Sequence, residues 1–185
     1  MNRLVLAFIC VLGFFQSASA DAAQYSFSSS GSRVTFHMSS TLHDFDGKAK
    51  SFKGTLDTDA GTGNLTVDAT SLTTDLGKRD KKMHSFCLES ATYGEITFEV
   101  TSITGDLAGL QSGAGTGQVT LNGNLTIRGM YVEAAIATDY AFEEGELSLR
   151  GSHRMSWKTF SVPDPSIIIS KLDPSMKVKF KLKAK

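Results

Sequence analysis

Strict alternation of apolar and polar residues is the feature that most constrains the fold. In the last segment, residues 176–183, every second residue is apolar and the four between them are lysines. Successive side chains of a β-strand point to opposite faces, so this segment presents one apolar face and one charged face. The row of lysines keeps the second face in water.

The same period of two recurs along most of the chain, and it predicts an all-β fold of about eight strands. Ala49 is out of phase within its segment, which indicates a bulge near Lys50. Because most connections are short and rich in glycine, we expect one antiparallel barrel or sandwich from about Gln24 to Lys183. The expected strands cover residues 33–38, 47–56, 65–70, 96–101, 119–127, 130–136, 147–157 and 176–183.

One stretch, residues 71–84, interrupts the alternation. It carries a run of charged residues from Asp75 to Lys82 and no apolar periodicity of its own. We therefore expect one short helix over about residues 78–85, after the third or fourth strand. A connection inside a strand scaffold is a favoured place for a functional site.

The first twenty residues have the pattern of a cleavable signal peptide. A basic start is followed by an apolar run, residues 4–15, and by the small-residue cleavage signal at residues 18–20. The run is too short to span a bilayer, and Cys10 lies inside it rather than at its end, which argues against a lipoprotein. We expect residues 1–20 to be removed and residues 21–185 to form one periplasmic or secreted domain, without stable membrane insertion.

Composition argues against several classes of function. The formal net charge is +0, so the composition gives no electrostatic footprint for nucleic acid. The chain has no phosphate loop, dinucleotide fingerprint or nucleophile elbow, and its four histidines lack the spacing of a zinc site. We expect no enzyme, no cofactor and no metal. A homodimer is left open.

The single cysteine of the processed chain has two readings. Cys87 follows Phe86, and the simpler reading makes it a small buried apolar residue. The alternative is a reactive or cross-linking thiol.

Small residues at inward positions suggest that the barrel is hollow. An eight-stranded barrel either is filled by its own side chains or holds one ligand. The small residues could leave room for a ligand, or they could only fit the taper and bends of the barrel. They are Ala49, Gly54, Ala69, Gly123, Ala134 and Gly151.

Several local motifs, taken together and in this order, resemble the YceI-like family over nearly all of the processed chain. Two departures are Gly94, where proline is common, and Trp157–Phe160, where many members carry an Asp-Phe-Gly type segment. The motifs are Ser40–Gly47 with Phe52–Gly54, Val67–Leu72 followed by Lys78–Asp80 and Met83, Tyr93–Phe98, and Gly123–Gly129.

The resemblance implies an elongated, lipocalin-like, eight-stranded antiparallel β-barrel with a long apolar tunnel. It also implies export to the periplasm and a long-chain amphiphile as ligand. We expect a carrier that holds a polyisoprenoid, a quinone or a fatty-acid derivative. The alternatives are a structural or stress-related barrel without ligand and an enzyme that acts on a lipid-like substrate.

The candidate site residues divide into a tunnel and a mouth. His153 is either a satisfied core residue or a hydrogen-bond partner for the polar end of a ligand. Arg79 and Asp80 either brace nearby loops or lie at the mouth, where the planar fork of Arg79 suits an anionic head group. The tunnel set is Val34, Phe36, Met38, Ala69, His153 and Trp157, and the mouth set is His43, Arg79 and Asp80.

Overall fold

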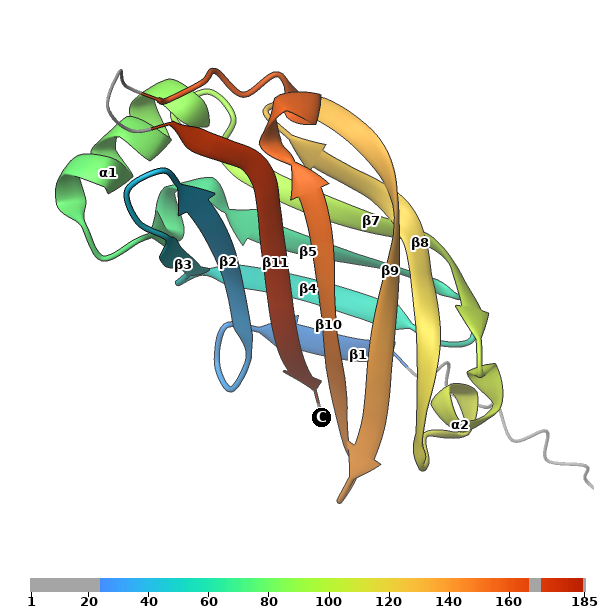
Figure 1. The fold of residues 1–185 in the computed structure, drawn as a ribbon. Helices are drawn as coiled ribbons and strands as arrows, with labels where there is room; N and C mark the ends of the chain where they lie inside the picture. The colour runs from blue at the N-terminus through green and yellow to red at the C-terminus, as the bar shows by residue number, and fades with distance from the viewer. Residues whose placement is uncertain (1–23, 167–170, 185) are drawn as a thin grey trace, which may run out of the picture.

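The computed structural model describes residues 24–166 and 171–184. In that part of the chain, eleven antiparallel strands form one strongly curled sheet with short helices at its ends (Figure 1). The all-β class and the short helix are confirmed. The expected signal peptide, residues 1–20, lies outside the described residues.

The strands follow the alternation, and each pairs with its neighbours in antiparallel register. Their order across the sheet is β1-β4-β5-β7-β8-β9-β10-β11-β2-β3-β6. Their bounds are β1 (Gln24–Ser28), β2 (Arg33–Ser40), β3 (Phe45–Ala49), β4 (Phe52–Asp57), β5 (Thr62–Asp68), β6 (Leu72–Thr73), β7 (Glu95–Gly105), β8 (Thr116–Ile127), β9 (Met130–Glu143), β10 (Glu146–Ser156) and β11 (Leu172–Ala184).

The expectation of eight strands in a closed barrel is wrong. The segment 47–56 is two strands, because after Ala49 the chain leaves β3, which pairs with β2, and enters β4, which pairs with β5. The out-of-phase Ala49 therefore marks a break and not a bulge. The other two extra strands are β1 and the two-residue β6, which is too short to show a period.

Short connections hold the two ends of the sheet together. Residues 29–32, 50–51 and 69–71 each join strands from opposite ends of the strand order. At one of these crossings Ser51 donates its backbone N–H to Ser71 Oγ (3.1 Å), and its carbonyl accepts from Asp68 N (3.1 Å). Within the described residues no ladder pairs β1 with β3 or β6, so the sheet is a curled half-barrel.

The two α-helices lie at opposite ends of the half-barrel (Figure 1). Helix α1 (Gly77–Lys82) continues into a π-helical turn, η2 (Met83–Cys87), close to the expected helix. Helix α2 (Leu107–Ser112) was not expected, because glycines flank it on both sides. Two 3₁₀ turns complete the fold, η1 (Ala69–Ser71) and η3 (Trp157–Phe160).

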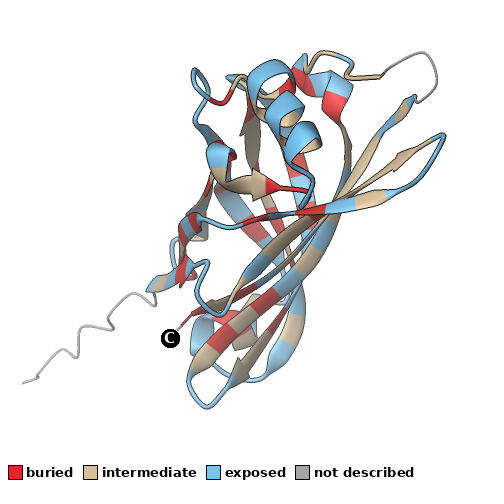
Figure 2. Ribbon diagram, turned by 90° about the vertical axis from the view of Figure 1, so that its left-hand side faces the viewer, coloured by how far each residue is buried: buried red, intermediate tan, exposed pale blue. Residues whose placement is uncertain are grey.

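The end of the half-barrel that carries α2 is packed solid. Leu110 of α2 and Leu147 of β10 are each 0% exposed, and Val119 of β8 is 1% exposed. These side chains belong to one continuous apolar cluster. Buried and exposed positions alternate along the strands around it, as the period of two predicts (Figure 2).

The inward glycines allow close approach and do not create space. A Cβ at Gly123 would lie 2.0 Å from the carbonyl oxygen of Glu99, and one at Gly54 would lie 2.4 Å from that of Asn64. At Gly151 the ring of Phe180 already occupies the position. At these three positions the small residues therefore leave no room for a ligand, because neighbouring strands and a ring occupy the space.

Candidate functional site: an apolar cavity at the α1 end

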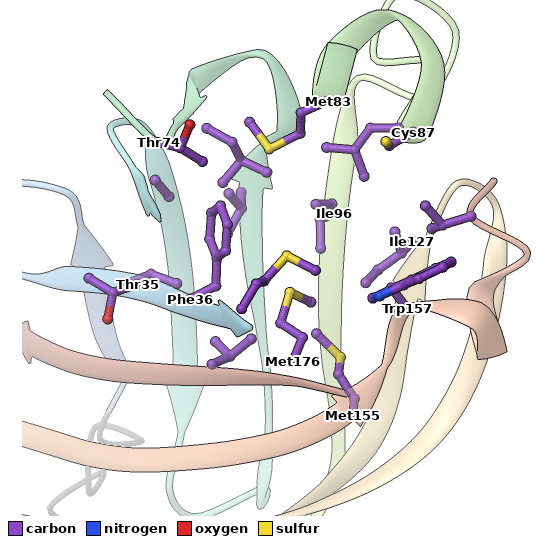
Figure 3. A pocket seen from close by; sticks show the side chains of 18 of the residues that line it. Thr35, Phe36, Thr74, Met83, Cys87, Ile96, Ile127, Met155, Trp157 and Met176 are labelled. Carbon is purple, nitrogen blue, oxygen red and sulfur yellow. The ribbon is translucent and has the colours of Figure 1, made fainter. Parts of the chain in front are cut away.

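The α1 end of the half-barrel encloses a cavity of about 500 Å³. Most of its wall comes from side chains of β2, β5, β7, β8, β10 and β11, with smaller parts from β3, β6 and β9, and α1 with η2 forms part of its rim (Figure 3). Ligand pockets in proteins commonly measure about 300–1,000 Å³ and are mostly apolar with a few polar groups. The cavity therefore has the size and the chemistry of a binding site for an apolar molecule.

Four methionine side chains give the cavity wall a flexible component. Four of the six methionines in the chain line the cavity: Met38, Met83, Met155 and Met176. Three of them are labelled in Figure 3, with Met83 reaching in from η2. An unbranched thioether side chain adapts to irregular shapes, so this wall can close around chains of different form.

The strand β2 supplies three of the predicted tunnel residues. Val34, Phe36 and Met38 all line the cavity, because alternate residues of β2 face inward. The ring of Phe36 lies over Gly47 of β3, where an added Cβ would come within 2.1 Å of it. Because Gly47 has no side chain, the Phe36 ring can lie directly against the backbone of β3.

Trp157 and His153 also line the cavity, and they differ in what they can offer a ligand. The indole N–H of Trp157 donates to the carbonyl of Asp173 (2.9 Å), so its ring serves as an apolar wall. Within the described residues the His153 imidazole has no hydrogen-bond partner, and partial burial lowers its pKa from the ordinary value. The imidazole is therefore neutral near pH 7, with one donor and one acceptor available.

Arg79 lies at the rim and is already partly engaged. Its Nε donates to Thr74 Oγ1 (2.7 Å) and its Nη2 to the Thr74 carbonyl (3.0 Å). The guanidinium carbon lies 4.0 Å from the centroid of the Phe45 ring. Since a guanidinium has five donors, Arg79 both holds the loop before α1 and keeps donors for a ligand at the rim.

Asp80 does not line the cavity, and it fixes the same loop. Its carboxylate accepts from Thr73 Oγ1 (2.6 Å), from Thr74 N (2.8 Å) and from Thr74 Oγ1 (2.5 Å). Partial burial acts to raise the pKa of Asp80, but these hydrogen bonds outweigh it and the pKa lies below its ordinary value. Asp80 therefore has the contacts of a brace.

Lys82 connects α1 to the opposite side of the rim. Its ammonium group donates to the carbonyl of Pro165 (2.5 Å), which belongs to the segment that follows η3. Both Lys82 and Pro165 line the cavity, together with His43 from the loop between β2 and β3. The rim is thus held by one hydrogen bond between two segments that are far apart in the sequence.

Cys87 lines the cavity as a free, buried thiol. Burial raises its pKa, so it is a neutral thiol near pH 7. Its burial agrees with the simpler interpretation, in which Cys87 is a small buried apolar residue.

The structure separates the predicted site residues into two groups. Seven of them line the cavity: Val34, Phe36, Met38, His43, Arg79, His153 and Trp157. Ala69 and Asp80 do not. Ala69 lies fully buried in η1, where its N–H donates to the Gly94 carbonyl (2.9 Å).

Sequence reasoning missed the methionines Met83, Met155 and Met176 as part of the site. The alternation placed Met155 and Met176 inward, but it gave no sign that their ends of the strands border empty space. Met83 lies in the predicted helix and has no strand pattern around it.

Among residues 24–166 and 171–184 there is no cluster of three or more His, Cys, Asp or Glu side chains able to hold a metal ion. None of the helices described is both long enough and apolar enough to cross a membrane.

Comparison with known proteins addresses the fold. A family model described as the YceI-like domain matches residues 25–184. No curated protein sequence matches the chain.

Three solved structures of low sequence identity have the same fold. A polyisoprenoid-binding domain from Saccharophagus degradans, implicated in plant cell wall breakdown, is 18% identical with a TM-score of 0.75, and 87% of this chain and 97% of that chain are covered. BcnA from Burkholderia cenocepacia is 18% identical with a TM-score of 0.73, at 85% and 98% coverage. The YCEI protein of Campylobacter jejuni is 14% identical with a TM-score of 0.60, at 75% and 84% coverage.

Proposed function

Since the chain belongs to the YceI-like family, we propose that it is an exported carrier that holds a long apolar chain with a small polar end. The single observation that carries this proposal is the cavity of about 500 Å³ with its apolar, methionine-rich wall. The polyisoprenoid-binding relative from Saccharophagus degradans supports a polyisoprenoid as one class of cargo. Quinones and fatty-acid derivatives have the same combination of a long chain and a polar end.

Burial of the apolar chain supplies most of the binding free energy. Each methylene removed from water contributes about 0.8 kcal/mol, so affinity rises with chain length until the cavity is full. Polar contacts contribute less and mainly set the orientation, because the wall offers few polar groups. The polar end lies at the rim, where Arg79 and His43 line the opening.

In the proposed compartment, this cavity would serve to transport a water-insoluble ligand. A long apolar chain is almost insoluble in water, so an exported soluble protein that encloses it can move it between membranes. The basic start, apolar run and cleavage signal of residues 1–20 support export to the periplasm or beyond. N-terminal sequencing of the exported protein should begin at or near Asp21, and retention of Met1 would contradict this part of the proposal.

Mass spectrometry of organic extracts tests the proposal most directly. Protein purified without detergent should release one repeatable class of long-chain molecule, and binding of saturated fatty acids to the emptied protein should strengthen with each added methylene. Affinity that does not change with chain length would overturn the carrier function. Absence of any bound species together with absence of binding would favour a structural role.

A fatty acid and the fatty alcohol of the same length together test whether Arg79 binds an anionic head group. In Arg79→Gln, a fatty acid should lose affinity while the fatty alcohol of the same length keeps it, because only the carboxylate uses the charge. Lys78→Gln on the exposed side of α1 is the matched control and should change neither ligand. Equal losses for acid and alcohol would mean that Arg79 only braces the loop.

A further inference from the structure

The outer surface of three neighbouring strands concentrates positive charge in a protein of balanced composition. Strands β10, β11 and β2 lie side by side (Figure 1). The apolar residues of β2, β10 and β11 line the cavity and the charged residues that alternate with them do not, so the charged residues face outward. Six outward cations define what we call the basic face: Arg33, Arg150, Arg154, Lys177, Lys179 and Lys181.

The register places several of these cations directly opposite one another. Lys181 of β11 is paired with Arg150 of β10 on one side and with Arg33 of β2 on the other. Lys177 is paired with Arg154 of β10. Like charges opposite each other across a ladder destabilise a sheet, so this arrangement costs stability in the isolated protein.

Three carboxylates border the basic face: Asp139 is opposite Arg150, and Asp44 and Asp46 are paired with His37, which is opposite Lys177. Within the described residues none of its six cations forms an ion pair, whereas the next lysine of the row, Lys183, is paired with Glu146. Asp139 of β9 accepts a hydrogen bond from Gln118 (2.9 Å). The arrangement therefore has an excess of charge that an anionic partner can satisfy.

The shape of the basic face indicates a broad partner. Lys177 and Lys181 are four residues apart, about 13 Å along the strand, and the three strands span about 10 Å across. A shallow groove of about 510 Å³ runs over the face, and the hydroxyl-bearing residues Thr35 and Ser152 lie between the cations. The cations thus form a two-dimensional array rather than a single line.

We propose that the basic face docks the protein on an anionic lipid bilayer. Each Lys or Arg near such a surface contributes to attraction, and an array of six gives reversible binding without insertion. Nucleic acid is disfavoured, because the outward residues of β2, β10 and β11 include no Phe, Tyr or Trp on which single-stranded bases could stack, and the one outward ring, His37, is paired with Asp46. An apolar protein partner is disfavoured, because the exposed large apolar side chains, such as Leu42 and Leu76, lie on other elements.

The test is flotation of the exported form of the protein with vesicles. We expect it to float with phosphatidylcholine vesicles that contain phosphatidylglycerol, not with phosphatidylcholine alone, and to be released by added salt. Arg150→Gln with Lys179→Gln should lower the partition coefficient about 25-fold, a factor of about five for each cation. The matched control, Lys78→Gln with Lys81→Gln on α1, should retain vesicle binding within about twofold.

Other measurements keep this inference separate from the proposed carrier function. Both double variants should unfold near the wild-type temperature, because the four altered side chains are exposed and form no ion pair. Both should bind a fatty acid as the wild type does, since the altered side chains lie outside the cavity. Equal flotation with neutral vesicles, or equal losses in the two double variants, would overturn the inference. Tighter binding of short single-stranded DNA than of anionic vesicles would also overturn it.

Discussion

The two ends of the half-barrel are built by the same alternation and yet have opposite interiors. Along β10, Leu147 and Leu149 are buried in the packed end, whereas His153 and Met155, in phase with them on the same strand, line the cavity. The inward residues of one strand thus pass from a filled interior to a hollow one. Alternation decides which way a side chain points, but it does not decide whether space remains in front of it.

The helices at the two ends account for the difference. Helix α2 inserts Leu110 into the interior, where it is 0% exposed. Helix α1 has no buried residue and contacts the rim through Arg79 and Lys82. One helix therefore fills its end of the half-barrel as a plug, and the other covers its end without entering it.

The largest expected contrast is the response of the two ends to truncation. Leu147→Ala should lower the free energy of unfolding by about 2–5 kcal/mol, because it creates a new void in a packed interior. Met176→Ala should cost about 1 kcal/mol or less, because its side chain already borders empty space and loses few contacts. Urea denaturation of both variants checks this. Similar losses at the two positions would show that the α1 end is as tightly packed as the other.

Filling the hollow end should weaken binding without lowering the stability of the fold. In Met155→Trp the larger side chain displaces at least about two methylenes of cargo, which weakens a long-chain fatty acid about tenfold or more. Met130→Trp is the matched control, because Met130 is 47% exposed and lies outside the cavity. Displacement of a fluorescent fatty acid measures both affinities. An unchanged affinity in Met155→Trp would show that the fatty acid does not bind in this cavity.

Much of the scaffold could be predicted from the sequence because period two is a local property. The strands of the wall follow from it directly, and the helix expected near residues 78–85 follows from its interruption. Helix α2 was missed because its glycine-rich flanks look like a loop. Its signals were Leu107 and Leu110, three residues apart, and Gly113, which ends the helix with a positive φ of 67°.

The site could be predicted only in part. Which end of a strand borders the cavity depends on distant elements and not on the local sequence. Val34, Phe36 and Met38, which alternation placed on the inward face of β2, line the cavity, and their contact with a ligand stays a prediction. The small residues divide between the two readings: Ala49 lines the cavity, whereas Gly123 and Gly54 accept close neighbours and Ala69 belongs to a turn. The basic face was hidden for a similar reason: one row of lysines is visible in the sequence, but only the register brings Arg33 and Arg150 beside it.

The cover formed by α1 should open faster when its contact across the rim is removed. Lys82→Gln loses the charged donor to the Pro165 carbonyl, and Lys81→Gln, one residue earlier and exposed, is the control. A hydrogen bond contributes about 0.5–1.5 kcal/mol, so cargo should dissociate about two- to tenfold faster in Lys82→Gln alone. Stopped-flow release of a fluorescent fatty acid measures this. Equal rates in the two variants would mean that the rim does not control release.

The smallest expected effect is a pH dependence confined to the loop before α1. The pKa of Asp80 lies below its ordinary value, so its stabilising contribution is present above pH of about 4 and is lost as the pH falls through the lowered pKa. Asp80→Asn keeps the shape of the side chain but removes the charge that accepts from Thr73 and Thr74. The wild type should therefore be more stable than Asp80→Asn near pH 7, by less than about 1 kcal/mol, and the difference should vanish in strong acid. Thermal unfolding of both proteins over a pH series checks the sign, and the other carboxylates cancel because they are common to both. A difference that grew as the pH fell would mean that Asp80 is not held as the hydrogen-bonded carboxylate that fixes this loop.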